Sequence, residues 1–112
     1  MSTAGHAVDR KRWAAMSIFE QMGNIYSEVG RSLNAKRQNR SQDCEHAVIR
    51  ALDLFDATVD TLIQRKSVRV KEVLRAKDQF LHAIYDKKST PGDIASIDRY
   101  FLQYAIAARL NH

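Results

Sequence analysis

Apolar residues recur along this chain at intervals of three and four, the period of an α-helix rather than of a β-strand. Four stretches carry the pattern, at residues 17–36, 42–64, 68–86 and 91–109. In each stretch an apolar stripe lies opposite a row of polar side chains, as in helices that bury one side. The pattern therefore predicts an all-α protein.

The same stripes predict which side chains form the core. The expected core positions are Ile18, Met22, Ile25, Val29, Leu33, Val48, Leu52, Phe55, Val59, Leu62, Val70, Val73, Leu74, Phe80, Leu81, Ile84, Tyr85, Ile97, Phe101, Tyr104 and Ala108.

Residues that favour helix starts precede each stretch. Ser17, with Glu20 three residues later, has the spacing of a capping box, in which each side chain binds the other residue's backbone N–H. Ser41, Ser67 and Thr90 are expected to cap the other three helices in the simpler way, with one side-chain oxygen.

The connections between the predicted helices are short, at residues 37–41, 65–67 and 87–90. Short connections make consecutive helices antiparallel neighbours. We therefore expect one domain over residues 17–110, a four-helix up-down-up-down bundle. Residues 1–16 are expected to form an N-terminal arm or a short helix, with Trp13 folded back over the end of the bundle.

The composition fits a small helical domain. Of the 112 residues 45% are hydrophobic, while only 4 are glycine and 1 is proline, too few turn formers for a many-stranded β fold. The single cysteine, Cys44, excludes an intrachain disulfide. Residues 1–10 lack the apolar segment of a secretion signal, and no apolar run approaches the roughly 20 residues of a membrane span. A cytoplasmic location without membrane contact is expected.

Two features predict contact with another molecule, most simply as a homo-oligomer. Leu102 and Ile106 lie one turn apart on the side of the last helix away from its core stripe. Gly23 and Gly30 lie seven residues apart on one side of the first helix, where each costs about 1 kcal/mol against alanine. Paired glycines favour the close approach of another helix, from this chain or from a second copy.

The net charge of +5 is compatible with nucleic acid or an acidic protein partner. In the predicted bundle, cations gather at both ends. One end carries Lys36, Arg37, Arg40, Lys87 and Lys88. The other end is the predicted site for nucleic acid or another anion, formed by Arg10, Lys11, Arg12, Arg65, Lys66 and Arg69.

Arg75 and His82 resemble the Arg-x4–6-His signature of HEPN ribonucleases, small helical bundles that dimerise. The resemblance implies RNA cleavage by this pair. Arg40 and His46 have a similar spacing, which shows how easily so short a motif arises by chance. The alternative for Arg75 and His82 is a solvated row that pairs with Asp78.

No residue pattern calls for a cofactor or a metal. The chain has no Glu-x-x-His of the kind that di-iron bundles use, and Cys44 and His46 are too close in sequence to supply a zinc set. The row Asp53, Asp56 and Asp60 is interpreted as a solvated boundary face.

The run at residues 16–31 and the ending at residues 100–109 resemble a group of small bacterial helical-bundle proteins with no characterised activity. The resemblance implies a single helical domain and no particular function. The sequence thus favours a non-enzymatic bundle that self-associates and binds a macromolecular partner. A HEPN-like ribonuclease and an antitoxin-type regulatory module are the alternatives.

Overall fold

The computed structural model describes residues 8–110, and the secondary structure in that range is entirely helical. The helices are α1 (Arg10–Ala14), α2 (Ile18–Arg37), α3 (Ser41–Gln64), α4 (Val70–Tyr85) and α5 (Pro91–Leu110). The all-α prediction is confirmed. The described range has five helices where the periodicity predicted four, because the short α1 spans too few turns to show a repeat.

Two of the four predicted caps are confirmed. Ser17 and Glu20 form the complete capping box at the start of α2. At the start of α5, Thr90 Oγ1 accepts from the Asp93 N–H, and the Asp93 carboxylate accepts from the Thr90 N–H. Both helices therefore begin where the sequence predicted, within one residue.

The other two caps were predicted wrongly. Ser41 is the first residue of α3, and the residue at its N-cap, Arg40, makes no side-chain capping bond. Helix α4 starts at Val70 because Ser67 Oγ accepts from the Arg69 N–H and holds that residue in the turn before the helix. Ser41 lies inside α3 and Ser67 lies before the N-cap residue of α4. Neither side-chain oxygen therefore reaches the N–H groups to which a capping residue binds.

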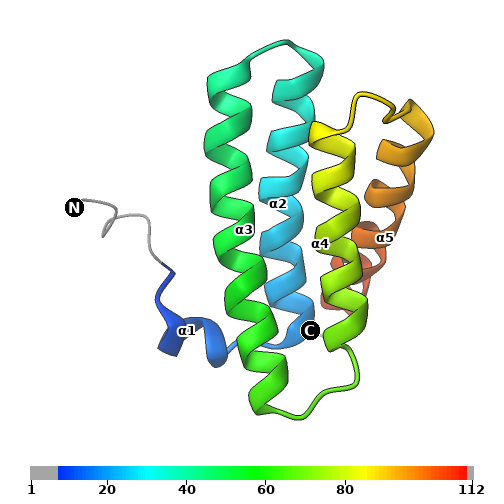
Figure 1. Cartoon of the computed structure of the whole chain (residues 1–112). Coiled ribbons are helices and arrows are strands. Elements are labelled where there is room, and N and C mark those ends of the chain that lie inside the picture. The colour runs from blue at the N-terminus through cyan, green and yellow to red at the C-terminus, as the bar shows by residue number, and fades with distance from the viewer. Residues whose placement is uncertain (1–7, 111–112) are drawn as a thin grey trace.

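Helices α2 to α5 lie side by side along most of their lengths, and α1 lies beside the C-terminal part of α3 (Figure 1). Helix α2 packs most extensively on α3 and next on α5, while α4 contacts both α3 and α5. Among the described residues, no helix is both long and apolar enough to cross a membrane.

Aromatic rings join these four helices at the centre of the core. Phe55 of α3 lies 6.1 Å from Phe80 of α4 and 6.1 Å from Phe101 of α5, measured between ring centroids. Phe101 also stacks on Tyr26 of α2 at 5.8 Å. Each aromatic pair adds about 0.5–1.5 kcal/mol to the area it buries, so this cluster fixes how the helices are rotated against one another.

Two predicted core residues of α4 are exposed instead. Leu74 and Tyr85 are 41% and 55% exposed, whereas the residues just before them, Val73 and Ile84, are buried. Neighbouring residues on a helix point about 100° apart, so the buried stripe of α4 accommodates only one of each pair. The Tyr85 hydroxyl instead donates to the Glu45 carboxylate on α3 at 2.9 Å. For Ala108, also predicted in the core, the side chain lies outside what the structure describes.

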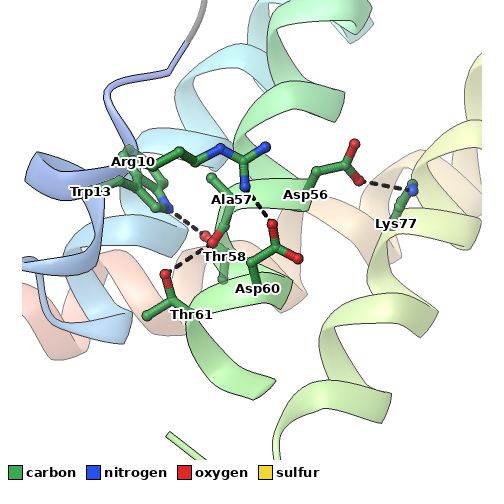
Figure 2. Close-up of polar contacts among 8 residues, drawn as sticks. All are labelled: Arg10, Trp13, Asp56, Ala57, Thr58, Asp60, Thr61 and Lys77. Atoms are coloured by element: carbon green, nitrogen blue, oxygen red, sulfur yellow. Dashed lines mark hydrogen bonds and ion pairs between the residues drawn. The ribbon is translucent and has the colours of Figure 1, made fainter. Parts of the chain in front are cut away.

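Helix α1 is held on α3 by one buried aromatic side chain and several polar contacts (Figure 2). Trp13 is only 6% exposed, and its indole Nε1–H donates to Thr58 Oγ1 at 2.9 Å. Gln21 of α2 donates from Nε2 to the Trp13 carbonyl at 2.8 Å. Arg10 pairs with Asp60 of α3 at 2.6 Å. The short helix is therefore bound to both α2 and α3.

We expect Thr58→Val to destabilise the protein by about 1–3 kcal/mol, because valine keeps the shape of threonine but leaves the buried Trp13 N–H without an acceptor. Urea unfolding followed by tryptophan fluorescence measures the change. Thr61→Val is the matched control: this buried hydroxyl donates only to the Ala57 carbonyl in its own helix, so we expect a smaller loss. Equal losses in the two variants would contradict the assigned role of Thr58.

Candidate functional site

Some side chains of the basic cluster predicted near α1 make contacts within the protein. Arg10 pairs with Asp60, as described above, and Arg65 donates to the carbonyls of Ala14 and Met16 at 2.7 and 3.0 Å. These contacts hold α1 and the connection to α2 against the end of α3. Arginines that tie the chain together in this way have fewer donors left for a ligand.

Arg69, the sixth member of this cluster, belongs to a polar group between α4 and α5. Its guanidinium donates to the Tyr104 hydroxyl at 3.3 Å and lies 3.7 Å from the Glu72 carboxylate. Lys11, Arg12 and Lys66 are exposed, and within residues 8–110 none of them takes part in an ion pair. Among residues 8–110, three of the six cations therefore have an internal partner, which leaves each of them with part of its donors, and three have no ion-pair partner.

Glu72 is the centre of that polar group. Its carboxylate accepts from the hydroxyls of Tyr100, at 3.1 Å, and Tyr104. Burial raises the pKa of both phenols, and the hydrogen bonds that link them with Glu72 contribute to the shift. The group fastens α5 to α4, and its phenols stay protonated and neutral at physiological pH.

The structure does not assemble Arg75 and His82 into a shared site. Both are exposed on α4, two turns apart. His82 Nδ1 lies 2.9 Å from the Asp86 carboxylate, and its Nε2 lies 3.9 Å from that of Asp93. The expected partner of this row was Asp78, so that interpretation is wrong for His82, whose nearest carboxylates are those of Asp86, just after its own helix, and of Asp93 in the first turn of α5.

In the part of the chain that the structure describes, no three His, Cys, Asp or Glu side chains gather as metal ligands do. The acidic row of α3 is used for ion pairs: Asp56 accepts from Lys77 of α4 at 3.3 Å, and Asp60 pairs with Arg10 (Figure 2). Burial raises the pKa of the Cys44 thiol, which keeps it protonated and weakly nucleophilic.

The four residues predicted for assembly lie on α2 and α5. Leu102 and Ile106 are 46% and 47% exposed. Apart from the adjacent residues and the backbone of α2 itself, no described atom would lie within 4 Å of a Cβ built on Gly23 or Gly30. The prediction that another helix of this chain approaches the glycines is therefore wrong, and the close-approach hypothesis is left with a second molecule.

One cavity was missed by the sequence analysis. A groove of about 260 Å³ lies between α2 and α3 and is lined by Arg31, Asn34, Ala35, Arg40, Asp43, His46, Ala47 and Arg50. Arg40 and His46, dismissed above as a chance spacing, both line it. The helical register was an available signal, because Arg40, Asp43, Ala47 and Arg50 follow one another at intervals of three and four and share one face of α3.

Comparisons with protein-family models, with curated proteins and with solved structures find no match for this chain. Its function is therefore argued from its own geometry.

The buried phenols give stability a pH dependence. Tyrosine ionises near pH 10 in an unfolded chain, and the pKa values of Tyr100 and Tyr104 are raised in the fold. This contribution is complete below about pH 10 and is lost as the pH rises further, because the unfolded state releases its protons first. We expect urea unfolding to show a free energy that falls above about pH 10, and a shallower fall in the double variant Tyr100→Phe/Tyr104→Phe. An unchanged slope in that variant would assign the pH dependence to other groups.

Proposed function

We propose that this protein is a non-enzymatic assembly module that forms a homodimer through the outer face of α2 and α5. The proposal treats α2 to α5 as an up-down-up-down four-helix bundle, which is supported by their short connections and side-by-side packing. The observations that carry it are two half-exposed aliphatic side chains on α5 and two glycines on α2 whose Cβ positions no other helix of the described chain covers. We call this surface the α2–α5 face, formed by Gly23, Gly30, Leu102 and Ile106.

The rotation of α5 supports Leu102 as a member of this face. Tyr100, one residue before the buried Phe101, contacts Glu72 of α4. Leu102, one residue after Phe101, therefore lies about 200° from Tyr100, on the flank of α5 next to α2. Ile106 follows one turn later on the same outer side. Both are large aliphatic side chains with nearly half of their surface in water.

The rotation of α2 brings its glycines to the same side. Glu28, one residue before the buried Val29, pairs with Arg50 of α3. Gly30, one residue after Val29, consequently lies on the opposite flank, next to α5, and Gly23 is seven residues away on that flank. The ring contacts of Phe19 with Tyr104 and of Tyr26 with Phe101 place α5 beside those two residues, while the glycine positions stay uncovered.

A second copy of this chain fits the α2–α5 face better than an unrelated partner. A two-fold dimer needs one surface that is complementary to itself. Here each copy offers both parts, a ridge at Leu102 and Ile106 and a shallow strip at the glycines, where a helix backbone can approach closely. Two such faces related by a two-fold axis would set the ridge of each copy on the strip of the other.

We expect static light scattering to give the mass of a dimer for the natural protein and of a monomer for Leu102→Glu, because a carboxylate in the centre of an apolar contact loses its hydration without gaining a partner. Ile63→Glu is the matched control: Ile63 is 58% exposed but belongs to α3. This variant should remain dimeric. A monomeric natural protein, or a dimer unaffected by Leu102→Glu, contradicts the proposal.

The glycines give a second test with effects of opposite sign. Since no described atom lies near the added Cβ, Gly23→Ala and Gly30→Ala should each stabilise the monomer by roughly 0.5–1 kcal/mol through helix propensity. The same methyl groups would hold an approaching helix away and raise the dissociation constant. Urea unfolding at low protein concentration gives the first quantity, and sedimentation equilibrium gives the second. A gain in stability with unchanged dimerisation would mean that the glycines have no role in assembly.

A further inference from the structure

We propose that the groove between α2 and α3 binds the phosphate backbone of a single-stranded nucleic acid. The site lies on another flank of α2 from the α2–α5 face and does not depend on dimerisation. Three of the side chains that line it are arginines, Arg31, Arg40 and Arg50, and a fourth is His46. We call it the arginine groove.

Carboxylates hold the arginines in place without saturating them. Glu28, whose side chain is only 14% exposed, accepts from Arg50 Nε at 3.1 Å and lies 3.2 Å from Arg31 Nη1. One partly buried carboxylate thus fixes two guanidinium groups from two helices. Each guanidinium has five N–H donors in a fixed plane, so most of them remain available to a ligand.

Arg40 is held more loosely than the other two. It pairs through Nη1 with Asp43 at 3.0 Å, and both side chains are about half exposed. Exposed pairs of this kind contribute little, about 0–1 kcal/mol, so an entering phosphate can displace the carboxylate. The three arginines, with Asp43 of the lining and the neighbouring Glu28, carry a net charge of about +1.

The shape and chemistry of the arginine groove favour a phosphate backbone. From Arg40 to Arg50 the groove follows α3 for about 15 Å, long enough for more than one phosphate group. The planar fork of arginine binds phosphate oxygens in pairs. The lining contains no Phe, Tyr or Trp, and the His46 ring is the single ring in it on which a base could stack. Binding is therefore expected to depend on charge and to be indifferent to base sequence.

The test is fluorescence anisotropy of a labelled oligothymidine, which has no base-paired structure, measured over a series of salt concentrations. With three arginines engaged, the logarithm of the binding constant should fall with the logarithm of salt concentration at a slope of roughly −2. Arg50→Ala should reduce that slope by about 0.7 and weaken binding about tenfold at low salt.

Several variants separate the groove from general surface charge. Asp43→Asn removes a competing carboxylate and should tighten binding. Arg50→Lys keeps the charge and should preserve most of the slope, which distinguishes a binding role from a loss of structure in Arg50→Ala. Arg75→Ala removes an exposed arginine from α4 and should change the constant less than twofold. The triple variant Lys11→Ala/Arg12→Ala/Lys66→Ala removes the free cations near α1 and should retain the slope contribution of the groove.

Three results would overturn the proposal. The first is an absence of salt-sensitive oligothymidine binding at low salt. The second is a loss of binding in the triple variant equal to or greater than the loss in Arg50→Ala. The third is displacement of oligothymidine by polyglutamate at an equal concentration of charges, which would instead identify an acidic protein as the ligand.

Discussion

The packing of Phe101 against Phe55 and Tyr26 is the contact on which the rest of the structure depends. It joins α5 to both α2 and α3 in the centre of the core, with the three rings about 6 Å apart. A helix has only one rotation that buries a given side chain. With Phe101 inward, Tyr100 must meet α4 and Leu102 must meet the solvent beside α2. The burial of Phe101 thus explains why one side of α5 is polar and packed while the other is apolar and exposed.

The contact with Phe101 also fixes the rotation of α2 about its own axis. Its buried stripe is bordered on one side by Tyr26, which stacks on α5, and on the other by Glu28, which binds an arginine of α3. The two flanks of α2 therefore have different chemistry, one apolar with glycines and one charged. Polar contacts complete the arrangement at one end of the bundle, where Trp13 packs on the C-terminal part of α3 and Glu72 joins α5 to the first turn of α4.

Much of the helical core could be predicted from the sequence, because burial follows the helical period. Phe55, Phe80 and Phe101 were predicted inside and are fully buried. The prediction failed where two apolar residues are adjacent, as with Tyr85 beside Ile84, since periodicity does not say which one the core accepts. It failed again at the start of α3. The chain enters this helix through Asn39, which has a positive φ of 57°, and there is no glycine at that position to predict such a turn.

Only the α3 side of the arginine groove could be predicted from helical register, because the groove itself is formed by two helices. Arg31 and Arg50 are far apart in sequence, and only the rotation of α2 against α3 brings both to Glu28. The α2–α5 face could be predicted in part, since Leu102 and Ile106 lie outside the apolar stripe of their own helix. The sequence did not indicate that the glycine positions are left uncovered by the other helices.

The position of α2 between these two surfaces has a consequence for avidity. If two copies join through one flank of α2, each still presents its charged flank to the solvent, and the pair becomes a rigid bivalent body. A polyanion long enough to reach both copies would then be retained far more tightly than a short one, because its second attachment is intramolecular. The length of the strand, more than its sequence, would decide what such a pair holds.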